Sequence, residues 1–255
     1  MATSDQDRAS PIAGPILIEF AGLPGSGKST VSHALAASLG RRGVEAREPS
    51  FDITEGRGKI ARRVSTFGYL VRAAGRKPLR CLAAMRVVRP GLPGGFGDAA
   101  QTAWNLLAVT GTATPARGAT VLDQGPIQAL WSVAFSANGK LDLGAAERWL
   151  HAFAADFARW WIVFVDVPEE LALARLEQRE SQISRLQDPT RPDRVADAQA
   201  ALAECQRAAE QLERAHPGKV QILRIRSRHE TDRDEEVARL VEAVAPAPGR
   251  ATPHN

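Results

Sequence analysis

The sequence has few cysteines, few aromatic residues and no long hydrophobic run. Its 255 residues include 2 cysteines, and aromatic side chains make up 5% of the chain. Cys81 and Cys205 are isolated, which excludes a disulfide framework and a zinc site. The longest apolar run, WWIVFV, is too short to cross a bilayer, and the polar start MATSDQDRAS lacks the apolar core of a signal peptide. We therefore expect a soluble, cytoplasmic protein.

Acidic residues are missing from one long stretch, Gly56 to Gly97, which carries ten Lys or Arg. The rest of the chain has 23 basic and 29 acidic residues, so the positive charge is local. Such a segment suits nucleic acid, an anionic membrane surface or a polyphosphate substrate. A solvated pair of basic helices explains the charge equally well.

Apolar runs alternate with helical patterns, which is typical of a parallel sheet with helices between its strands. The helical patterns cover 28–43, 168–180 and 193–218, the last beginning at an Asp193 cap. Prolines and glycines interrupt the interval between the second and third strands, which predicts helices or a lid there rather than sheet. Strands are expected near residues 16–21, 44–48, 119–123, 161–166 and 220–225.

The most specific motif is GLPGSGKS, which matches the P-loop pattern G-x-x-x-x-G-K-[ST] between an apolar strand and a helix. Its glycines allow sharp turns and leave N–H groups to converge on phosphate. Lys28 would reach the β and γ oxygens of ATP, and Ser29 would hold Mg²⁺. A merely tight strand-to-helix turn is the structural alternative. The predicted nucleotide-binding residues are Gly22, Leu23, Pro24, Gly25, Ser26, Gly27, Lys28, Ser29 and Thr30.

Two classes of P-loop protein are excluded by missing motifs. The chain has no N-K-x-D guanine motif of switch GTPases and no L-S-G-G-Q signature of transporter ATPases. Kinases remain. The stretches LIEFAGLPGSGKSTVSHALAASLGRRGVEAREP, ARGATVLDQGPIQ and VFVDVPEELALARLEQRESQISRLQD resemble the thymidylate kinase group of nucleotide kinases. The resemblance implies a three-layer α/β P-loop NTPase fold, with a five-stranded parallel sheet flanked by helices, a helical acceptor lid and a LID segment.

The resemblance also implies a domain organisation. One kinase-like domain is expected over 13–245, with the basic acceptor insertion at about 56–97 and the LID at about 179–192. Residues 1–12 and 246–255 are expected to be disordered tails.

Phosphoryl transfer needs cations and alignment, and the sequence offers both. Arg175 and Arg179 lie four residues apart on one helical face, and Arg185 follows. We expect Arg175 to contact the nucleotide and the other two to act from the LID, although pairing with nearby glutamates would be an ordinary alternative. Asp123 ends the third strand beside the P-loop, where it would accept the acceptor's proton or hold Mg²⁺ through water. The predicted catalytic residues are Lys28, Asp123, Arg179 and Arg185, and the metal ligands are Ser29 and Asp123.

The acceptor side departs from the thymidylate kinase pattern. Gln124 stands where that group has Arg after the third-strand Asp, and Thr102 or Gln101 occupies the place of a second Arg. Either arginines of the basic segment replace them, such as Arg57, Arg62 or Arg63, or the acceptor is not a nucleoside monophosphate. Glu48 and Asp52 are weaker candidates for the metal or the acceptor, and Trp104 and Trp131 would either stack on a base or belong to the core. The predicted acceptor residues are Arg47, Glu48, Arg57, Gln101, Trp104 and Gln124.

These features predict an ATP- and Mg²⁺-dependent kinase that transfers the γ-phosphate to a nucleotide or another small molecule. The alternative is an NTP-hydrolysing switch or accessory protein that docks on a membrane or nucleic acid through residues 56–97. We also expect the protein to be able to form a homodimer.

Overall fold

The computed structural model describes residues 14–49, 68, 71, 75–88, 95–115, 117–178, 186, 193–226 and 230–245. These residues form one five-stranded sheet in which every pair of neighbouring strands is parallel, as the sequence predicts. The predicted strand at 44–48 is shorter than expected and keeps only two residues. In spatial order the strands are β2 (Ala46–Arg47), β3 (Ala119–Leu122), β1 (Ile16–Ala21), β4 (Arg159–Asp166) and β5 (Val220–Arg226).

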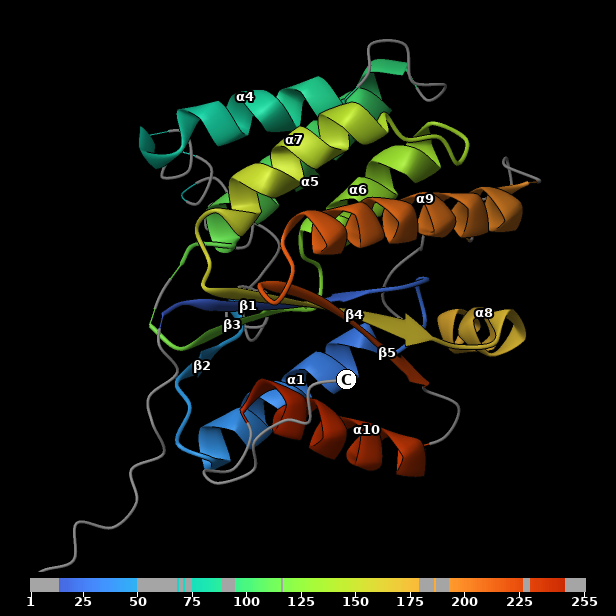
Figure 1. Cartoon of the computed structure of the whole chain (residues 1–255). Helices are drawn as coiled ribbons and strands as arrows, with labels where there is room; N and C mark the ends of the chain where they lie inside the picture. Colours follow the sequence, from blue (N-terminus) through green and yellow to red (C-terminus); the bar gives the residue numbers. More distant parts are fainter. Residues whose placement is uncertain are drawn as a thin grey trace, which may run out of the picture.

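Helices cover both faces of the sheet (Figure 1). Helices α1 and α10 lie on one face, α4, α5, α6, α7 and α9 form the other layer, and α8 lies beyond the carboxyl end of β4. The described part of the interval between β2 and β3 carries α4 and α5, so the prediction of helices there is confirmed. The helices are α1 (Lys28–Arg41), α4 (Pro78–Val87), α5 (Gly95–Thr112), α6 (Pro126–Ser136), α7 (Leu143–Ala154), α8 (Glu169–Glu177), α9 (Arg194–Ala215) and α10 (Glu230–Val244).

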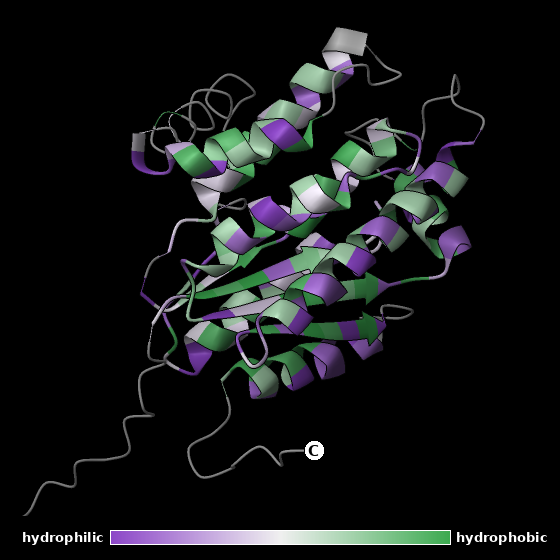
Figure 2. Cartoon of the chain, turned by 45° about the horizontal axis from the view of Figure 1, so that its top comes forward, coloured by the Kyte–Doolittle hydropathy of each residue, from purple (hydrophilic) through white to green (hydrophobic). Residues whose placement is uncertain are grey.

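The central strand β1 divides its side chains between the two layers. Ile18 and Phe20 pack on the side of α1 and α10, whereas Leu17 and Ala21 join the larger core under α6 and α9. This alternation follows from the two-residue period of a strand, and it leaves β1 buried on both faces. In Figure 2 the strands are accordingly mostly hydrophobic, with hydrophilic residues concentrated on the helices around them.

The helix ends agree only in part with the sequence predictions. Helix α1 ends at Arg41, and Gly43 follows with a positive φ of 76°. Asp193 is the N-cap residue of α9, as predicted, although its side chain makes no capping hydrogen bond. No described helix is long and apolar enough to cross a membrane. The predicted tails, 1–12 and 246–255, lie outside the described residues.

Candidate active site

The P-loop joins the carboxyl end of β1 to the first turn of α1. Gly25 has a φ of +85°, and a Cβ atom there would lie 2.3 Å from the carbonyl oxygen of Ala172 in α8. Only glycine suits this position, because the backbone is left-handed and α8 leaves no room for a side chain. Gly27 precedes α1 and offers no capping side chain, and no acidic residue lies in the first turn. The positive end of α1 therefore faces the loop without a nearby carboxylate on its own helix.

Lys28 is held inside the loop rather than extended away from it. Its side chain is nearly buried, and Nζ donates to the carbonyl oxygens of Gly22 (2.9 Å) and Leu23 (2.8 Å) and to Ser26 Oγ (3.4 Å). A positive charge and a helix N-terminus thus converge on one small volume. This arrangement favours a bound anion.

Asp123 and Ser29 meet across neighbouring strands. Asp123 follows β3, which pairs with β1, and its Oδ2 accepts a 2.8 Å hydrogen bond from Ser29 Oγ. Asp123 Oδ1 is buried and has no hydrogen-bond partner within the described part of the chain. A hydroxyl and a carboxylate are the hard oxygen ligands that Mg²⁺ prefers, so these two residues fit a magnesium site.

A second carboxylate lies at the end of the next strand. Glu48 follows β2, and its oxygens contact Ser32 Oγ at 2.8 Å and His33 Nδ1 at 3.0 Å. Glu48 is nearly buried, whereas the His33 side chain is 54% exposed. Because β2 pairs with β3, Glu48 and Asp123 end adjacent parallel strands.

Beneath these residues lies a buried carboxyl that the sequence analysis missed. Glu19 is fully buried in β1, where Oε2 accepts from the backbone N–H of Ile127 (2.9 Å) and Oε1 from Trp160 Nε1 (3.0 Å). Burial raises the pKa of Glu19 from 4.5 to about 8, although these hydrogen bonds oppose the shift. The signal was a lone carboxylate in the apolar strand ILIEFA. Gln128, also missed, accepts the N–H of Gly22 through Oε1 at 3.0 Å.

Of the three predicted arginines, the structure describes Arg175, which belongs to the helix that packs against the P-loop. Ala172 and Leu176 of α8 pack against Gly25, and Arg175 lies between them in sequence, half-buried. Arg179 and Arg185 lie outside the described residues, as does most of the expected LID. The position of α8 is therefore compatible with the predicted role of Arg175.

The predicted acceptor residues are scattered. Gln124 is exposed directly after Asp123, and Gln101 is exposed on α5, where it donates to Asn105 Oδ1 at 2.9 Å. Arg47 is exposed and pairs with Glu45 at 3.0 Å. Trp104 is 37% exposed. Arg57, Asp52, Arg62 and Arg63 lie outside the described residues.

Two candidates for the acceptor side belong to the interior instead. Thr102 is completely buried, and its hydroxyl donates to the carbonyl oxygens of Asp98 and Ala99 in its own helix. Trp131 is buried in α6, where it stacks on Phe135 and donates to the carbonyl oxygen of Ala198. Neither side chain is available to a ligand in this conformation. Gln101 is thus the better match for the missing arginine.

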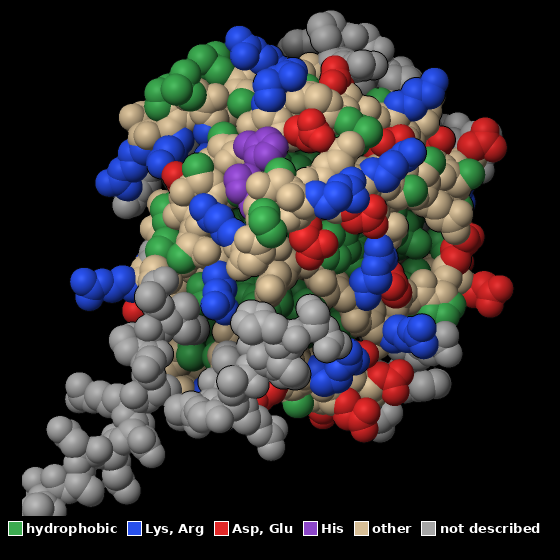
Figure 3. All heavy atoms as spheres, in the orientation of Figure 1, with side chains coloured by type: hydrophobic (Ala, Val, Ile, Leu, Met, Phe, Trp, Pro, Cys, Tyr) green, Lys and Arg blue, Asp and Glu red, His purple; other side chains and the backbone are tan. Residues whose placement is uncertain are grey.

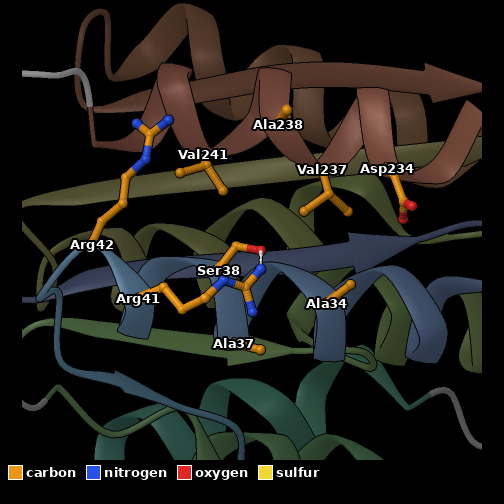
Figure 4. Close-up of a pocket in the computed structure, with 9 residues that line it drawn as sticks. All are labelled: Ala34, Ala37, Ser38, Arg41, Arg42, Asp234, Val237, Ala238 and Val241. Atoms are coloured by element: carbon orange, nitrogen blue, oxygen red, sulfur yellow. Dashed lines mark hydrogen bonds between the residues drawn. The ribbon is translucent and has the colours of Figure 1, made fainter.

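A groove of about 480 Å³ lies away from the P-loop, between α1 and α10 (Figure 4). Its wall is formed by small apolar side chains together with the polar side chains of Ser38, Arg41, Arg42 and Asp234. Its α1 residues run from Ala34 to Arg41, which lie roughly 9 to 20 Å along the helix from Lys28 at a rise of about 1.5 Å per residue. No residue of the P-loop lines the groove, so it is separate from the candidate active site.

Comparison with known proteins adds little beyond the fold. No protein-family model matches the chain, and no curated protein matches it. Similar solved structures include shikimate kinase from Bacteroides thetaiotaomicron, with 14% identity over 89% of this chain and 97% of that one and a TM-score of 0.39. Deoxyadenosine kinase from M. mycoides with bound dCTP has 10% identity, coverage of 89% and 100%, and a TM-score of 0.43. Thymidylate kinase from Candida albicans has 12% identity, coverage of 91% and 93%, and a TM-score of 0.44.

The sheet and the loop decide the fold by themselves. A parallel five-stranded sheet lies between two helical layers, and the P-loop sequence connects β1 to α1. The chain has a three-layer P-loop NTPase fold. The predicted three-layer fold with a five-stranded parallel sheet is thus confirmed.

Proposed function

We propose that the chain is an ATP- and Mg²⁺-dependent phosphotransferase that acts on a nucleotide or another small molecule. One observation carries the proposal: Ser29 of the P-loop and Asp123 of the neighbouring strand are joined at 2.8 Å, next to a buried lysine. A tight turn with a purely structural role would not need both a buried ammonium within the loop and a partly unsatisfied carboxylate bonded to the next residue, Ser29.

In the proposed reaction an acceptor oxygen bonds to the γ-phosphorus while the bond from that phosphorus to the β–γ bridging oxygen breaks. Lys28 stabilises the negative charge on the transferred phosphoryl group and the leaving diphosphate. Asp123 accepts the proton if the acceptor is a hydroxyl, and Glu48 is the alternative proton acceptor. Bound Mg²⁺, held by Ser29 and by Asp123 through water, would neutralise phosphate charge.

Phosphorylation of a panel of acceptors tests this function. Purified protein is incubated with Mg²⁺, with ATP or another nucleoside triphosphate, and with nucleoside monophosphates, nucleosides, sugars or aminoglycoside-like alcohols. An acceptor should accelerate nucleotide consumption and appear as a phosphorylated product. Consumption that no acceptor stimulates would contradict the kinase assignment and favour the hydrolytic alternative.

One observation favours a second candidate, an NTP-hydrolysing accessory protein that docks on an anionic membrane. Leu79, Leu82 and Met85 of α4 are 80%, 58% and 47% exposed, and Arg86 is exposed beside them. Lys77 is also exposed, although it pairs with Asp156 at 2.9 Å. Figure 3 shows hydrophobic side chains gathered at the upper left, over α4, with Lys and Arg nearby. Apolar side chains flanked by cations suit an anionic lipid surface better than nucleic acid.

Vesicle binding distinguishes this candidate. Docking predicts co-sedimentation with phosphatidylserine-containing vesicles but not with phosphatidylcholine alone, and a several-fold loss in Arg86→Ser. Arg239→Ser removes the same charge from an exposed site on α10 and serves as the control. Equal binding to both vesicle types, or binding to DNA only, would reject docking on an anionic membrane. A concentration-dependent dimer that Leu82→Asn disrupts would assign the apolar face to a second copy.

A further inference from the structure

Glu19 occupies a position where the fold itself needs no acid. Its neighbours on the same face of β1, Leu17 and Ala21, are apolar members of the larger core. Its hydrogen-bond partners in the described part of the chain are backbone and indole N–H groups rather than a cation. Because a buried carboxyl is costly unless its oxygens are bonded, its specific contacts explain its presence better than packing does.

These contacts fix one short segment of chain. Ile127, whose N–H reaches Glu19 Oε2, is in the first turn of α6. A Cβ atom on Gly125 would lie 2.3 Å from the same oxygen, so the backbone of Gly125 rests directly on the carboxyl. Trp160 of β4 holds the other oxygen. The carboxyl thus ties the turn between β3 and α6 to the centre of the sheet.

The same segment reaches the proposed site at both of its ends. Asp123, at its start, accepts from Ser29 at 2.8 Å. Gln128, at its end, accepts from the N–H of Gly22 at 3.0 Å. A shift of this segment would therefore change both the Asp123 contact and the first residue of the P-loop.

We propose that Glu19 is a positioning residue that fixes the segment from Asp123 to Gln128 and so places the Asp123 carboxylate against Ser29. This inference rests on the proposed phosphotransferase function. Glu19 acts through Asp123 rather than on the reacting atoms. A misplacement on the scale of 1 Å can cost up to about 10²-fold in rate, so the positioning is large enough to measure.

Glu19→Gln tests the contact with little change of shape. The amide keeps one acceptor oxygen, but its NH₂ group must face either the Ile127 N–H or the Trp160 N–H. We expect kcat to fall about tenfold, with little change in ATP affinity measured without Mg²⁺. Trp160→Phe added to Glu19→Gln removes one competing donor and should restore part of the loss.

A double-mutant cycle with Asp123 separates positioning from stability. If Glu19 acts through Asp123, Glu19→Gln should reduce the Mg²⁺-dependent gain in binding of a fluorescent ATP analogue in the wild-type background and leave it unchanged in Asp123→Asn. A purely structural role predicts the same loss of thermal stability in both backgrounds and no change in that gain. Thr110→Val, which removes a buried hydroxyl from α5, controls for stability alone.

The outcomes are distinct. Additive effects of the two substitutions on Mg²⁺-dependent binding, or an unchanged Glu19→Gln variant, would overturn the inference. Failure of the wild-type protein to bind the nucleotide would instead overturn the proposed function. If Glu19→Gln does not fold, Glu19→Asp keeps the acid but shortens its reach, and the same cycle with Asp123→Asn decides the question.

Discussion

The P-loop edge of the sheet and the outer face of α4 handle polar and apolar groups in opposite ways. At the P-loop edge, polar side chains are buried and bonded across elements, as for Lys28 and Glu19. On α4, large apolar side chains such as Leu79 and Leu82 are exposed. In the first region the buried side chains of Lys28 and Glu19 find hydrogen-bond partners within the chain, whereas the second presents surface that folding of the described residues leaves uncovered.

Two buried ionisable residues are held in different ways. Arg80 of α4 is buried against α7, where it pairs with Asp156 and lies 4.1 Å from the centre of the Phe153 ring. Burial lowers the pKa of Arg80, and Asp156 opposes the shift. Glu19 instead relies on N–H groups. Arg80 thus anchors a helix through a counterion, whereas Glu19 holds a turn of the proposed site.

The largest effect is expected at Lys28. Lys28→Ala removes the ammonium from the P-loop, so turnover should fall by at least about 10³-fold, while the fold is retained. Circular dichroism and nucleotide consumption measure the two quantities. Lys140→Ala, which removes an exposed lysine, should behave like the wild type. A fully active Lys28→Ala variant would contradict the P-loop assignment.

The next largest loss of turnover is expected for Asp123, which follows β3, the strand paired with β1. Asp123→Asn should lower kcat by about 10²-fold, with a smaller change in ATP affinity, because it weakens proton acceptance and metal binding together. Asp234→Asn removes an exposed carboxylate from α10 and is the matched control. Near wild-type turnover in Asp123→Asn would reduce Asp123 to a structural partner of Ser29.

Arginines introduced on the acceptor side should raise the activity on thymidine monophosphate. With Gln124 and Gln101 in place of two arginines, thymidine monophosphate should be phosphorylated with a kcat/KM at least about 10³ below that of the true acceptor. Thr102 is buried, so an arginine at that position would not reach the acceptor's phosphate. The test is therefore Gln124→Arg combined with Gln101→Arg. Activity on the monophosphate should rise about tenfold or more. Ala203→Arg on α9 adds charge at an exposed site as a control, and efficient wild-type turnover of thymidine monophosphate would refute the reasoning.

The last expected effect concerns stability and its dependence on pH rather than turnover. Because burial raises the pKa of Glu19 from 4.5 to about 8, the folded chain retains a proton there that the unfolded chain releases. The free energy of unfolding of the wild type, relative to Glu19→Gln, should therefore fall as the pH rises from about 5 to 8, by up to about 1.4 kcal/mol per pH unit. Urea denaturation across this range measures it. A constant difference between the two proteins would show that Glu19 titrates normally.

Most of the fold and the centre of the site could be predicted because their signals are local. The P-loop chemistry lies in consecutive residues, and strands buried on both faces read as apolar runs. The contacts of Glu19 could not be predicted, since its partners Ile127 and Trp160 are 108 and 141 positions away. Thr102 was misplaced for a related reason: sequence spacing does not reveal which face of α5 turns inward.

Phosphorus NMR of the reaction mixture tests the central claim most directly, because it follows the γ-phosphate itself. Wild-type protein, Mg²⁺ and ATP are incubated with each acceptor of the panel, beside Lys28→Ala. The account predicts that with one class of acceptor the γ signal is replaced by that of a phosphorylated product, and that Lys28→Ala leaves it unchanged. If the wild type yields only inorganic phosphate with every acceptor, or consumes no ATP, the account is contradicted.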